Sequence, residues 1–262
     1  MDQEIAAKLV GSYTATLCAM LAGMQKANLI TSRPGLVTMS ELSNREQAAA
    51  PTGAALANSD SRVLASHEHG VSRQLRLERN GHEGAVVWLT GLSGAGKTTL
   101  AMALERSLFD QGCEVYVLDG DNLRHGLNRD LGFKPEDRSE NIRRVGEVAA
   151  LFADAGVICI VALISPYRAD RERARAAARP GSFFEVHVAA SVEVCESRDP
   201  RGLYKMARSG VIKNFTGIDA PYEEPLKPEV VVNTGQAGPD ACVRRIEGRV
   251  LGMIRRASER VE

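Results

Sequence analysis

The sequence predicts an α/β fold in which a parallel sheet is covered by helices on both faces and by a mobile lid at one end. From about residue 63 onward, continuous apolar runs alternate with amphipathic ones, a pattern typical of strands buried on both faces between crossover helices. A glycine-rich loop, Gly91–Thr98, lies between the first such strand and the helix that follows it. Together these observations indicate a fold of the P-loop nucleoside triphosphate hydrolase type.

The first strand and the first helix of this domain are the clearest elements. Ala85–Thr90 is a short apolar run rich in β-branched residues, and Leu100, Leu104 and Leu108 recur at helical spacing before Gly112. The same criteria predict strands at 85–90, 114–118, 157–164, 183–189 and 229–232. They predict helices at 97–111, 138–155, 169–178 and 240–257, with a polar segment at 195–215.

The chain is expected to divide near residue 60. Residues 1–30 are predicted to form an amphipathic helical extension, residues 31–62 a linker rich in Pro, Gly, Ser and Asn, and residues 63–262 the P-loop domain. The uncharged run within the extension is too polar for a comfortable membrane span. Its acidic leader residues, Asp2 and Glu4, argue against a signal peptide.

Composition favours an ordinary soluble domain in a reducing compartment. Hydrophobic residues make up 44% of the 262 residues, which is enough for a substantial core. The 33 basic and 33 acidic residues give a net charge of zero, so neither nucleic acid nor an anionic membrane is expected as a partner. The five cysteines are widely spaced and odd in number, which suggests no disulfide framework or zinc site and predicts a cytoplasmic location.

The glycine-rich loop predicts a site for ATP and Mg²⁺. Its glycines let backbone N–H groups turn toward phosphate oxygens, and the following helix adds the positive end of its dipole. Lys97 supplies a charge for the β- and γ-phosphates, and Thr98 is the expected Mg²⁺ ligand. A plain glycine turn with a solvated lysine is the alternative. The predicted ATP-binding residues of this loop are Gly91, Leu92, Ser93, Gly94, Ala95, Gly96, Lys97, Thr98 and Thr99.

Acidic residues follow the second predicted strand, in the run Asp119–Arg124 (Asp-Gly-Asp-Asn-Leu-Arg). Ligands of open α/β sheets bind at the carboxyl ends of the strands, so Asp119 and Asp121 are expected beside the glycine-rich loop. A carboxylate there can orient an acceptor hydroxyl and receive its proton, although a solvated Asp-Gly turn is the alternative. The strand at 157–164 ends without an acid. Any carboxylate near the metal is therefore expected from this turn, a pattern closer to small-molecule kinases than to motors or GTPases.

The helix predicted at 138–155 places two polar side chains toward the interior. At 100° per residue, Arg138 lies on the apolar stripe of this helix and Asn141 lies at its edge. A buried guanidinium needs an anionic partner. That partner is either an anionic acceptor substrate or a structural carboxylate, Asp119 or Glu140.

Basic residues between 197 and 208 predict the lid. This segment carries Arg198, Arg201, Lys205 and Arg208, which is more charge than a buried helix tolerates. A lid that closes over the phosphates would exclude water and so limit premature hydrolysis of the nucleotide. A plain solvated helix is the alternative interpretation.

Six motifs, in order, resemble those of the adenylylsulfate kinase family, from about His67 to Thr234. They are Gly91–Thr98, Asp119–Arg124, Asp130–Phe133, Arg138–Arg144, Ile164–Arg168 and Phe215–Asp219. The resemblance implies MgATP-dependent phosphorylation of the 3′-hydroxyl of adenosine 5′-phosphosulfate, giving 3′-phosphoadenosine 5′-phosphosulfate and ADP in sulfate assimilation. Two departures are visible, because Arg201 stands where the family commonly carries lysine and residues 1–60 resemble nothing in the kinase.

The resemblance also implies roles for individual residues. Asp121 would lie near the acceptor hydroxyl, Arg198 would pack on the ATP adenine, and two rings, Phe133 and Phe215, would sandwich the substrate adenine. Ser165 holds the family's phosphoserine position, but its neutral turn offers no base, so direct in-line transfer is expected and Ser165 would line the substrate pocket. The substrate-binding residues would be Asp121, Arg124, Phe133, Arg138, Asn141, Ile164, Ser165, Lys205 and Phe215.

Two other functions remain open at this point. One is a P-loop kinase for another small hydroxyl acceptor, such as a nucleoside or a sugar. The other is a nucleotide-dependent regulatory module that uses the N-terminal extension as its contact. The resemblance further implies a homodimer, and residues 1–60 are too few to encode an ATP sulfurylase, so an enzyme that supplies the substrate would be a separate chain.

Overall fold

The computed structural model describes residues 69–255, which lie within a unit that spans His67–Glu262. The predicted N-terminal helix at 1–30 and the linker at 31–62 lie outside the described residues. The centre of the described part is a five-stranded sheet with the strand order β2-β3-β1-β4-β5, and every pair of neighbouring strands is parallel. The predicted α/β fold with a parallel sheet is confirmed.

The strands and helices lie within a few residues of their predicted positions. The strands are β1 (Ala85–Thr90), β2 (Val115–Asp119), β3 (Ile158–Ala162), β4 (Phe183–Ala189) and β5 (Val230–Asn233). The helices are α2 (Arg73–Asn80), α3 (Lys97–Asp110), α4 (Gly120–Leu123), α5 (Pro135–Asp154), α6 (Arg168–Ala177), α7 (Val192–Arg198), α8 (Leu203–Arg208) and α9 (Pro239–Arg255).

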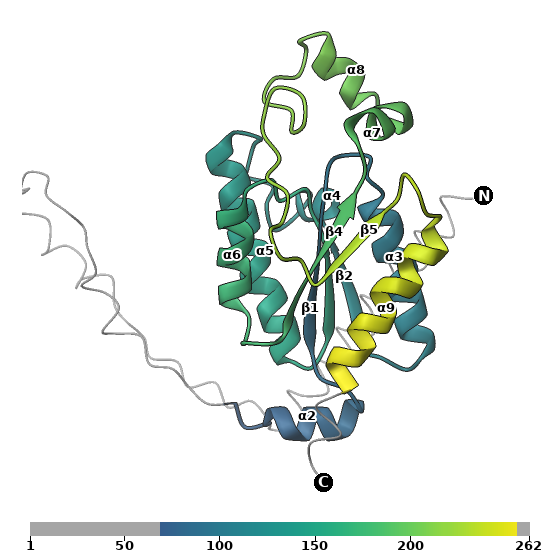
Figure 1. Ribbon diagram of the computed structural model, residues 1–262. Helices are drawn as coiled ribbons and strands as arrows, with labels where there is room; N and C mark the ends of the chain where they lie inside the picture. Colours follow the sequence, from purple (N-terminus) through teal and green to yellow (C-terminus); the bar gives the residue numbers. More distant parts are fainter. Residues whose placement is uncertain (1–68, 256–262) are drawn as a thin grey trace, which may run out of the picture. The chain divides into compact units, whose positions relative to one another are not determined.

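Helices cover both faces of the sheet, as Figure 1 shows: α3 and α9 pack on one face, and α5 and α6 pack on the other. The central strand β1 is buried throughout and contributes alternate side chains to two cores. Val87 and Leu89 join the core beneath α3 and α9, whereas Val86 and Trp88 join the core beneath α5 and α6. Burial on both faces explains why the strand is apolar from Ala85 to Leu89, and the hydroxyl of the last residue, Thr90, donates to the Ile164 carbonyl oxygen.

Helix α5 begins at Pro135, three residues earlier than predicted. Proline suits the first turn of a helix because its missing N–H has no partner there, and the acidic Glu136 and Asp137 favour the positive end of the helix dipole. Arg138 therefore closes the first turn, and Asn141 lies in the second turn rather than the first.

Helix α2 was not predicted from the sequence. It is mostly exposed, has the cap residue Ser72, and is attached to the domain by an ion pair between Arg73 and the buried Glu83. Arg179 also bonds Glu83, at 3.2 Å. A short polar helix of this kind depends on such tertiary contacts rather than on an apolar stripe, so periodicity alone does not detect it.

The polar segment predicted at 195–215 contains two short helices, α7 and α8. Tyr204 and Ala207 of α8 are buried, whereas Lys205 and Arg208 are exposed. The segment is thus neither a buried helix nor a fully solvated one. Its apolar side packs on the domain and its basic side faces outward, at the end of the molecule where the strands finish (Figure 1).

Three chain segments with polar residues meet at the carboxyl ends of the strands. The glycine-rich loop follows β1, the acidic turn that becomes α4 follows β2, and the Ser165 turn follows β3. Parallel strands bring these turns to one edge of the sheet. Within residues 69–255, no helix is both long enough and apolar enough to cross a membrane.

Candidate active site

The glycine-rich loop is shaped by contacts that exclude side chains. A Cβ atom at Gly91 would lie 2.4 Å from the Val188 carbonyl oxygen, and one at Gly94 would lie 2.9 Å from the Cys195 carbonyl oxygen. Gly94 also has a φ of +76°, which L-residues rarely adopt. The loop therefore packs closely against the end of β4 and against α7, and it turns its backbone toward the N-terminus of α3.

Lys97 is buried beneath the loop. Its Nζ atom donates hydrogen bonds to the carbonyl oxygens of Gly91 at 2.9 Å and Leu92 at 2.7 Å. Burial lowers the pKa of the ammonium from 10.5 to about 8, although nearby acidic groups, including Asp119 and Asp121, oppose this shift. The charge predicted for the phosphates is thus present at neutral pH and is held by neutral carbonyl oxygens.

Thr98 and Asp119 form an oxygen-rich pair beside the loop. The Thr98 hydroxyl donates to Asp119 Oδ2 at 2.8 Å, and Asp119 Oδ1 accepts the backbone N–H of Asp121 at 3.0 Å. Asp119 is only 7% exposed. A hydroxyl and a carboxylate are hard oxygen donors, so these residues fit the Mg²⁺ ion that the loop predicts.

Asp121 lies on the exposed side of the same turn. It forms an ion pair with Arg201, which comes from the connection between α7 and α8. The contact was not predicted from sequence, where Arg201 was only one basic residue of the lid. Because Arg201 also lowers the pKa of Lys97, these three charged groups lie within electrostatic range of one another.

Arg138 and Arg124 lie together on the other side of the site. Arg138 donates to the carbonyl oxygens of Phe133 at 2.9 Å and Asn214 at 2.6 Å and to Thr216 Oγ1 at 2.5 Å. The alternative of a structural ion pair with Asp119 or Glu140 is therefore wrong. Among the described residues, none of the ion pairs includes Arg138 or Arg124.

Arg124 also has only neutral hydrogen-bond partners in the described part of the chain. Its Nη1 atom donates to the carbonyl oxygens of Leu131 at 3.1 Å and Gly132 at 3.0 Å. Burial lowers the pKa of its guanidinium, and the like charge of Arg138 lowers it further. Two half-buried cations thus lie close together without a carboxylate bonded to either, which favours an anionic ligand at this position.

The two phenylalanines predicted to hold an adenine have different surroundings. Phe133 is 66% exposed, and the Arg124 guanidinium lies 4.4 Å from the centre of its ring. Phe215 is buried and packs edge-on against Tyr204 of α8, with ring centres 4.9 Å apart. Arg138 bonds the backbone at Phe133 and next to Phe215, so it connects the two segments that carry these rings.

Asn141 and Ser165 are both buried. Asn141 accepts a hydrogen bond from Asn128 at 3.0 Å, a neighbour that was not predicted. Ser165 is 1% exposed, and its hydroxyl accepts the indole N–H of Trp88 at 3.1 Å. This partner is a donor and not a base, so it would not activate Ser165 as a nucleophile. Ile164, which precedes it, is half-buried.

The residues assigned to the nucleotide base and the lid lie at α7 and α8. Arg198 donates to the carbonyl oxygens of Gly94 at 3.3 Å and Thr234 at 2.6 Å, so it joins the glycine-rich loop to the end of β5.

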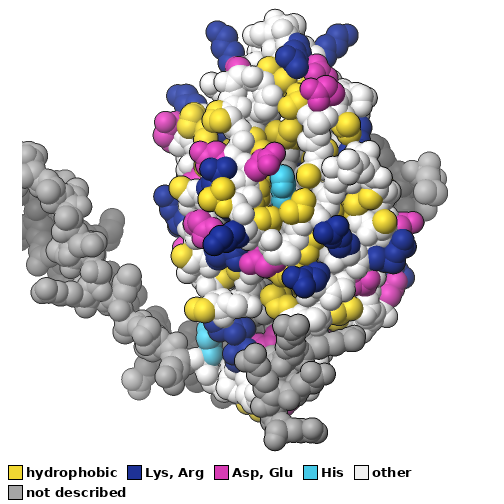
Figure 2. Space-filling model, viewed as in Figure 1, with side chains coloured by type: hydrophobic (Ala, Val, Ile, Leu, Met, Phe, Trp, Pro, Cys, Tyr) yellow, Lys and Arg dark blue, Asp and Glu magenta, His cyan; other side chains and the backbone are white. Residues whose placement is uncertain are grey.

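Helix α8 carries the second of these residues, Lys205, which is exposed. Basic side chains project around α8 at the upper end of the face seen in Figure 2, while acidic and basic groups are mixed over the rest of that face. Tyr204 anchors α8 by donating to the Ser93 carbonyl oxygen at 2.9 Å.

The fold and the loop define a P-loop phosphotransferase, and comparison with known proteins gives its family. Residues 83–233 match the sequence profile described as "Adenylylsulphate kinase". The chain belongs to the adenylylsulfate kinase family. A similar protein, the adenylyl-sulfate kinase of Geotalea daltonii, is 61% identical over 168 residues, which cover 64% of this chain and 83% of the relative.

Two further comparisons agree with this assignment. The adenylyl-sulfate kinase of Staphylococcus carnosus is 55% identical over 180 residues, covering 69% of this chain and 90% of the relative. The solved structure of the Mycobacterium tuberculosis APS kinase CysC in complex with AMPPNP and APS is 45% identical and has a TM-score of 0.61. The match covers 64% of this chain and 98% of that one.

Some polar residues around this site were not assigned from the sequence. Thr216 lies in one of the six motifs, but its contact with Arg138 depends on how two distant segments fold together. Arg171 and Glu185 form a buried ion pair at 2.7 Å. In the sequence they are a helical arginine and a glutamate within an apolar strand, and only the glutamate's position in a buried strand was a signal that it needs a partner.

Proposed function

We propose that this chain transfers the γ-phosphoryl group of ATP directly to the 3′-hydroxyl of adenosine 5′-phosphosulfate, with the residues described above in defined roles. Membership of the adenylylsulfate kinase family and the P-loop architecture support the reaction. The products are 3′-phosphoadenosine 5′-phosphosulfate and ADP.

On the donor side, the backbone of Gly91–Thr99 holds the phosphates and Lys97 contributes its positive charge. The ammonium would exchange its two carbonyl partners for phosphate oxygens. A hydrogen bond from an ammonium to a charged phosphate oxygen is stronger than one to a neutral carbonyl oxygen. Thr98 and Asp119 would hold Mg²⁺, and the ion would supply positive charge to the phosphates during transfer. Arg198, held at Gly94 and Thr234, would pack on the adenine of ATP.

On the acceptor side, Asp121 would orient the 3′-hydroxyl and receive its proton. This role requires Arg201 to leave Asp121 or to share it, and the freed guanidinium would then face the transferred phosphoryl group. Lys205 would add charge in the lid, whose mobility is part of the proposal. Ser165 would support the pocket without forming a phosphoserine.

The observation that carries the acceptor assignment is the charge of Arg124 and Arg138. Both guanidiniums are half-buried, each has only neutral hydrogen-bond partners among the described residues, and each is near enough to affect the other. A phosphosulfate group would supply the matching negative charge. Phe133 and Phe215 would stack on the substrate adenine, and Ile164 and Asn141 would complete the pocket.

The cellular setting belongs to the same proposal. We place the reaction in the cytoplasm, in sulfate assimilation, in a homodimer, with an ATP sulfurylase as a separate chain that supplies the substrate. Support comes from the family and, for the cytoplasm, from the five widely spaced cysteines. The molar mass in solution, measured by light scattering, tests the dimer.

The direct test is product formation by the full chain with MgATP. Adenosine 5′-phosphosulfate, adenosine, AMP and a sugar are offered as separate acceptors, and the nucleotides are resolved chromatographically. We expect 3′-phosphoadenosine 5′-phosphosulfate and ADP in equal amounts with the first acceptor only. Selective turnover of another acceptor would assign the chain a different kinase activity, and nucleotide binding without turnover of any acceptor would favour a regulatory module.

A further inference from the structure

We infer that Arg171 is a positioning residue for the acceptor half of the site, because it fixes the Ser165 turn against the segment that carries Phe215. The inference rests on the proposed function, since it states which substrate loses affinity when Arg171 is replaced. Arg171 lies on α6 and belongs to none of the residues predicted to bind a substrate.

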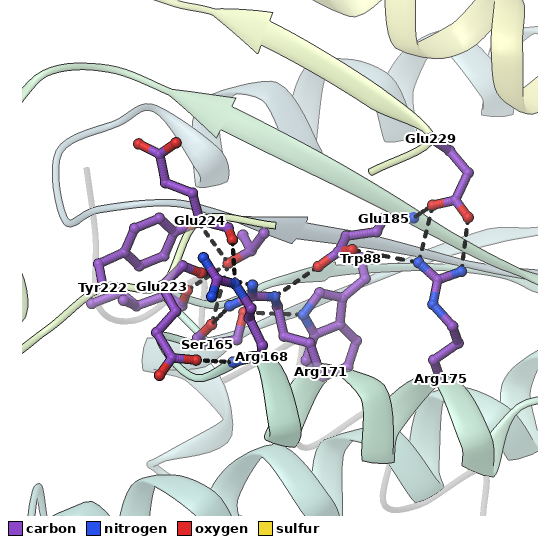
Figure 3. A network of polar contacts seen from close by, with 12 residues as sticks. Trp88, Ser165, Arg168, Arg171, Arg175, Glu185, Tyr222, Glu223, Glu224 and Glu229 are labelled. Atoms are coloured by element: carbon purple, nitrogen blue, oxygen red, sulfur yellow. Dashed lines mark hydrogen bonds and ion pairs between the residues drawn. The ribbon is translucent and has the colours of Figure 1, made fainter. Parts of the chain in front are cut away.

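Arg171 donates hydrogen bonds from all three nitrogen atoms of its guanidinium, as the network in Figure 3 shows. Nε donates to Glu185 Oε1, Nη1 donates to the Ser165 carbonyl oxygen, and Nη2 donates to the Glu223 carbonyl oxygen, each at 2.7 Å. The side chain is 2% exposed. One planar group therefore joins β4, the turn after β3, and the segment between α8 and β5.

The charge of Arg171 is already matched inside the protein. Glu185 is buried with it, and Glu229 holds the neighbouring Arg175 through bonds of 2.8 and 3.1 Å (Figure 3). This arrangement is the opposite of Arg138, whose partners are all neutral. Arg171 is therefore suited to holding the chain in place and not to binding the substrate anion.

The turn that Arg171 holds has a strained backbone. Ser165 has a φ of +40°, which lies in the left-handed region that residues with a side chain rarely adopt. Its carbonyl oxygen accepts Arg171 Nη1 at 2.7 Å and Thr90 Oγ1 at 3.4 Å. Because a strained conformation persists only where its surroundings fix it, loss of the Arg171 donor would let this turn relax.

The segment after Phe215 is attached to the same place by further bonds. The Glu223 N–H donates to the Pro166 carbonyl oxygen at 2.8 Å, and the Glu223 carboxylate accepts the Arg168 N–H at 2.8 Å. Arg168 Nε donates to the Glu224 carbonyl oxygen at 2.7 Å. We call the set Arg168, Arg171 and Glu223 the clasp.

The clasp and Arg138 hold the two ends of one segment. Arg138 bonds the backbone at Asn214 and the side chain of Thr216, whereas the clasp bonds the backbone at Glu223 and Glu224. Phe215 lies beside the first attachment, and we expect its position to change when the second attachment of the same segment is loosened. The three hydrogen bonds of Arg171 among the described residues go to Glu185, Ser165 and Glu223, and none of these residues lies in the glycine-rich loop. Loosening the clasp should therefore weaken acceptor binding and spare ATP.

Arg171→Lys is the sharpest test, because lysine keeps the charge opposite Glu185 but cannot make three directed bonds. We expect the KM for adenosine 5′-phosphosulfate to rise about tenfold or more, as the loss of one or two charge-assisted hydrogen bonds would give. The dissociation constant of a non-hydrolysable ATP analogue should stay within about twofold of the parent value. Arg173→Ala, on the exposed side of the same helix, is the matched control and should change neither quantity.

The fluorescence of Trp88 gives a second readout, which does not depend on enzymatic activity. It is the single tryptophan of the chain, and its indole N–H bonds the Ser165 hydroxyl directly. Arg171→Lys should shift the Trp88 fluorescence emission in the folded protein, whereas Arg173→Ala should leave the spectrum unchanged. An unchanged spectrum in Arg171→Lys would show that the Ser165 turn does not depend on Arg171.

If Arg171→Lys does not fold, the double variant Arg171→Met with Glu185→Gln removes both buried charges together and makes the same comparison. Arg168→Ala removes one surface bond of the clasp and should raise the same KM by a smaller factor. The inference is overturned if the KM for adenosine 5′-phosphosulfate is unchanged in a folded variant, or if it rises in parallel with the dissociation constant of the ATP analogue. Absence of 3′-phosphoadenosine 5′-phosphosulfate with the unmodified chain would instead refute the proposed function.

Discussion

The donor and acceptor halves of the site use charge in different ways. In the donor half, one ammonium, Lys97, is held by two loop carbonyl oxygens, and Thr98 is bonded to the carboxylate of Asp119. In the acceptor half, two guanidiniums, Arg124 and Arg138, lie close together and have only neutral hydrogen-bond partners among the described residues. The first half thus combines a closely packed backbone loop with one cation and a carboxylate, whereas the second brings two cations together without a carboxylate bonded to either.

This difference suggests how each half selects its ligand. A loop of closely packed glycines recognises the geometry of a polyphosphate through backbone N–H groups, and every nucleoside triphosphate carries that geometry. Two adjacent guanidiniums instead favour an acceptor that brings its own negative charge. We therefore expect specificity for the acceptor to depend on Arg124 and Arg138, and phosphate chemistry to depend on the loop.

Lys97→Ala should give the largest effect, because it removes the main positive charge of the donor half. We expect kcat/KM to fall by about 10³-fold or more, as is typical when a charge that stabilises the transferred phosphoryl group is lost. Arg106→Ala, exposed on the same helix and paired with Asp110, should have normal kinetics. A mild effect of Lys97→Ala would contradict the division into two halves.

Asp121→Ala tests the carboxylate that is proposed to orient the acceptor hydroxyl and receive its proton. Loss of a group that orients the hydroxyl and receives its proton should lower kcat by about 10²–10³-fold. Binding of an ATP analogue, measured by calorimetry, should be preserved, because Asp119 and not Asp121 bonds Thr98. Asp110→Ala, at the far end of α3, is the control. Normal transfer by the Asp121 variant would remove this carboxylate from the mechanism.

Arg138→Gln should affect the acceptor half alone. Glutamine can keep one bond to the carbonyl oxygen of Phe133 or Asn214, but the charge is gone, and charge-assisted hydrogen bonds contribute about 1.5–3 kcal/mol. We expect the KM for adenosine 5′-phosphosulfate to rise about 10- to 100-fold with the KM for ATP unchanged. Arg143→Gln is the matched control, since Arg143 is paired with Glu140 on the exposed side of α5. An equal rise in the KM for both substrates would contradict the assignment of Arg138 to the acceptor half alone.

The sequence was sufficient to predict the sheet and most helices for a simple physical reason. Strands buried on both faces need continuous apolar runs, and helices packed on them need an apolar stripe, so both leave patterns in the order of residues. Helix α2 left no such pattern, because an ion pair between Arg73 and Glu83 attaches it to the domain. Helix α5 begins earlier than predicted because Pro135, Glu136 and Asp137 form a polar first turn that precedes the apolar stripe.

The positions of the candidate site residues were predictable only in part, for a related reason. Candidate residues that belong to a local motif, such as Lys97 and Thr98, are positioned by their neighbours in sequence. Contacts that join distant segments are not, which is why the pairing of Asp121 with Arg201 and the clasp on Arg171 became visible only in the structure. The inward position of Arg138 was predictable from helical period, but its neutral partners were not.

The halves should also differ in their response to pH, with a smaller effect than any substitution gives. Burial lowers the pKa of Lys97 from 10.5 to about 8, so the free protein loses this charge as pH rises through 8, while bound phosphates favour the protonated form. The affinity for an ATP analogue should be about fourfold weaker at pH 8.5 than at pH 7, with protons taken up on binding. The guanidiniums of Arg124 and Arg138 stay charged throughout this range, so the KM for adenosine 5′-phosphosulfate should not follow the same curve.

Lys97→Arg tests whether Lys97 causes this pH dependence. Arginine keeps its charge, so the variant should lose the change in ATP affinity between pH 7 and pH 9 even where its binding is weaker. An ATP affinity that is constant from pH 7 to pH 9 would mean that Lys97 does not titrate there.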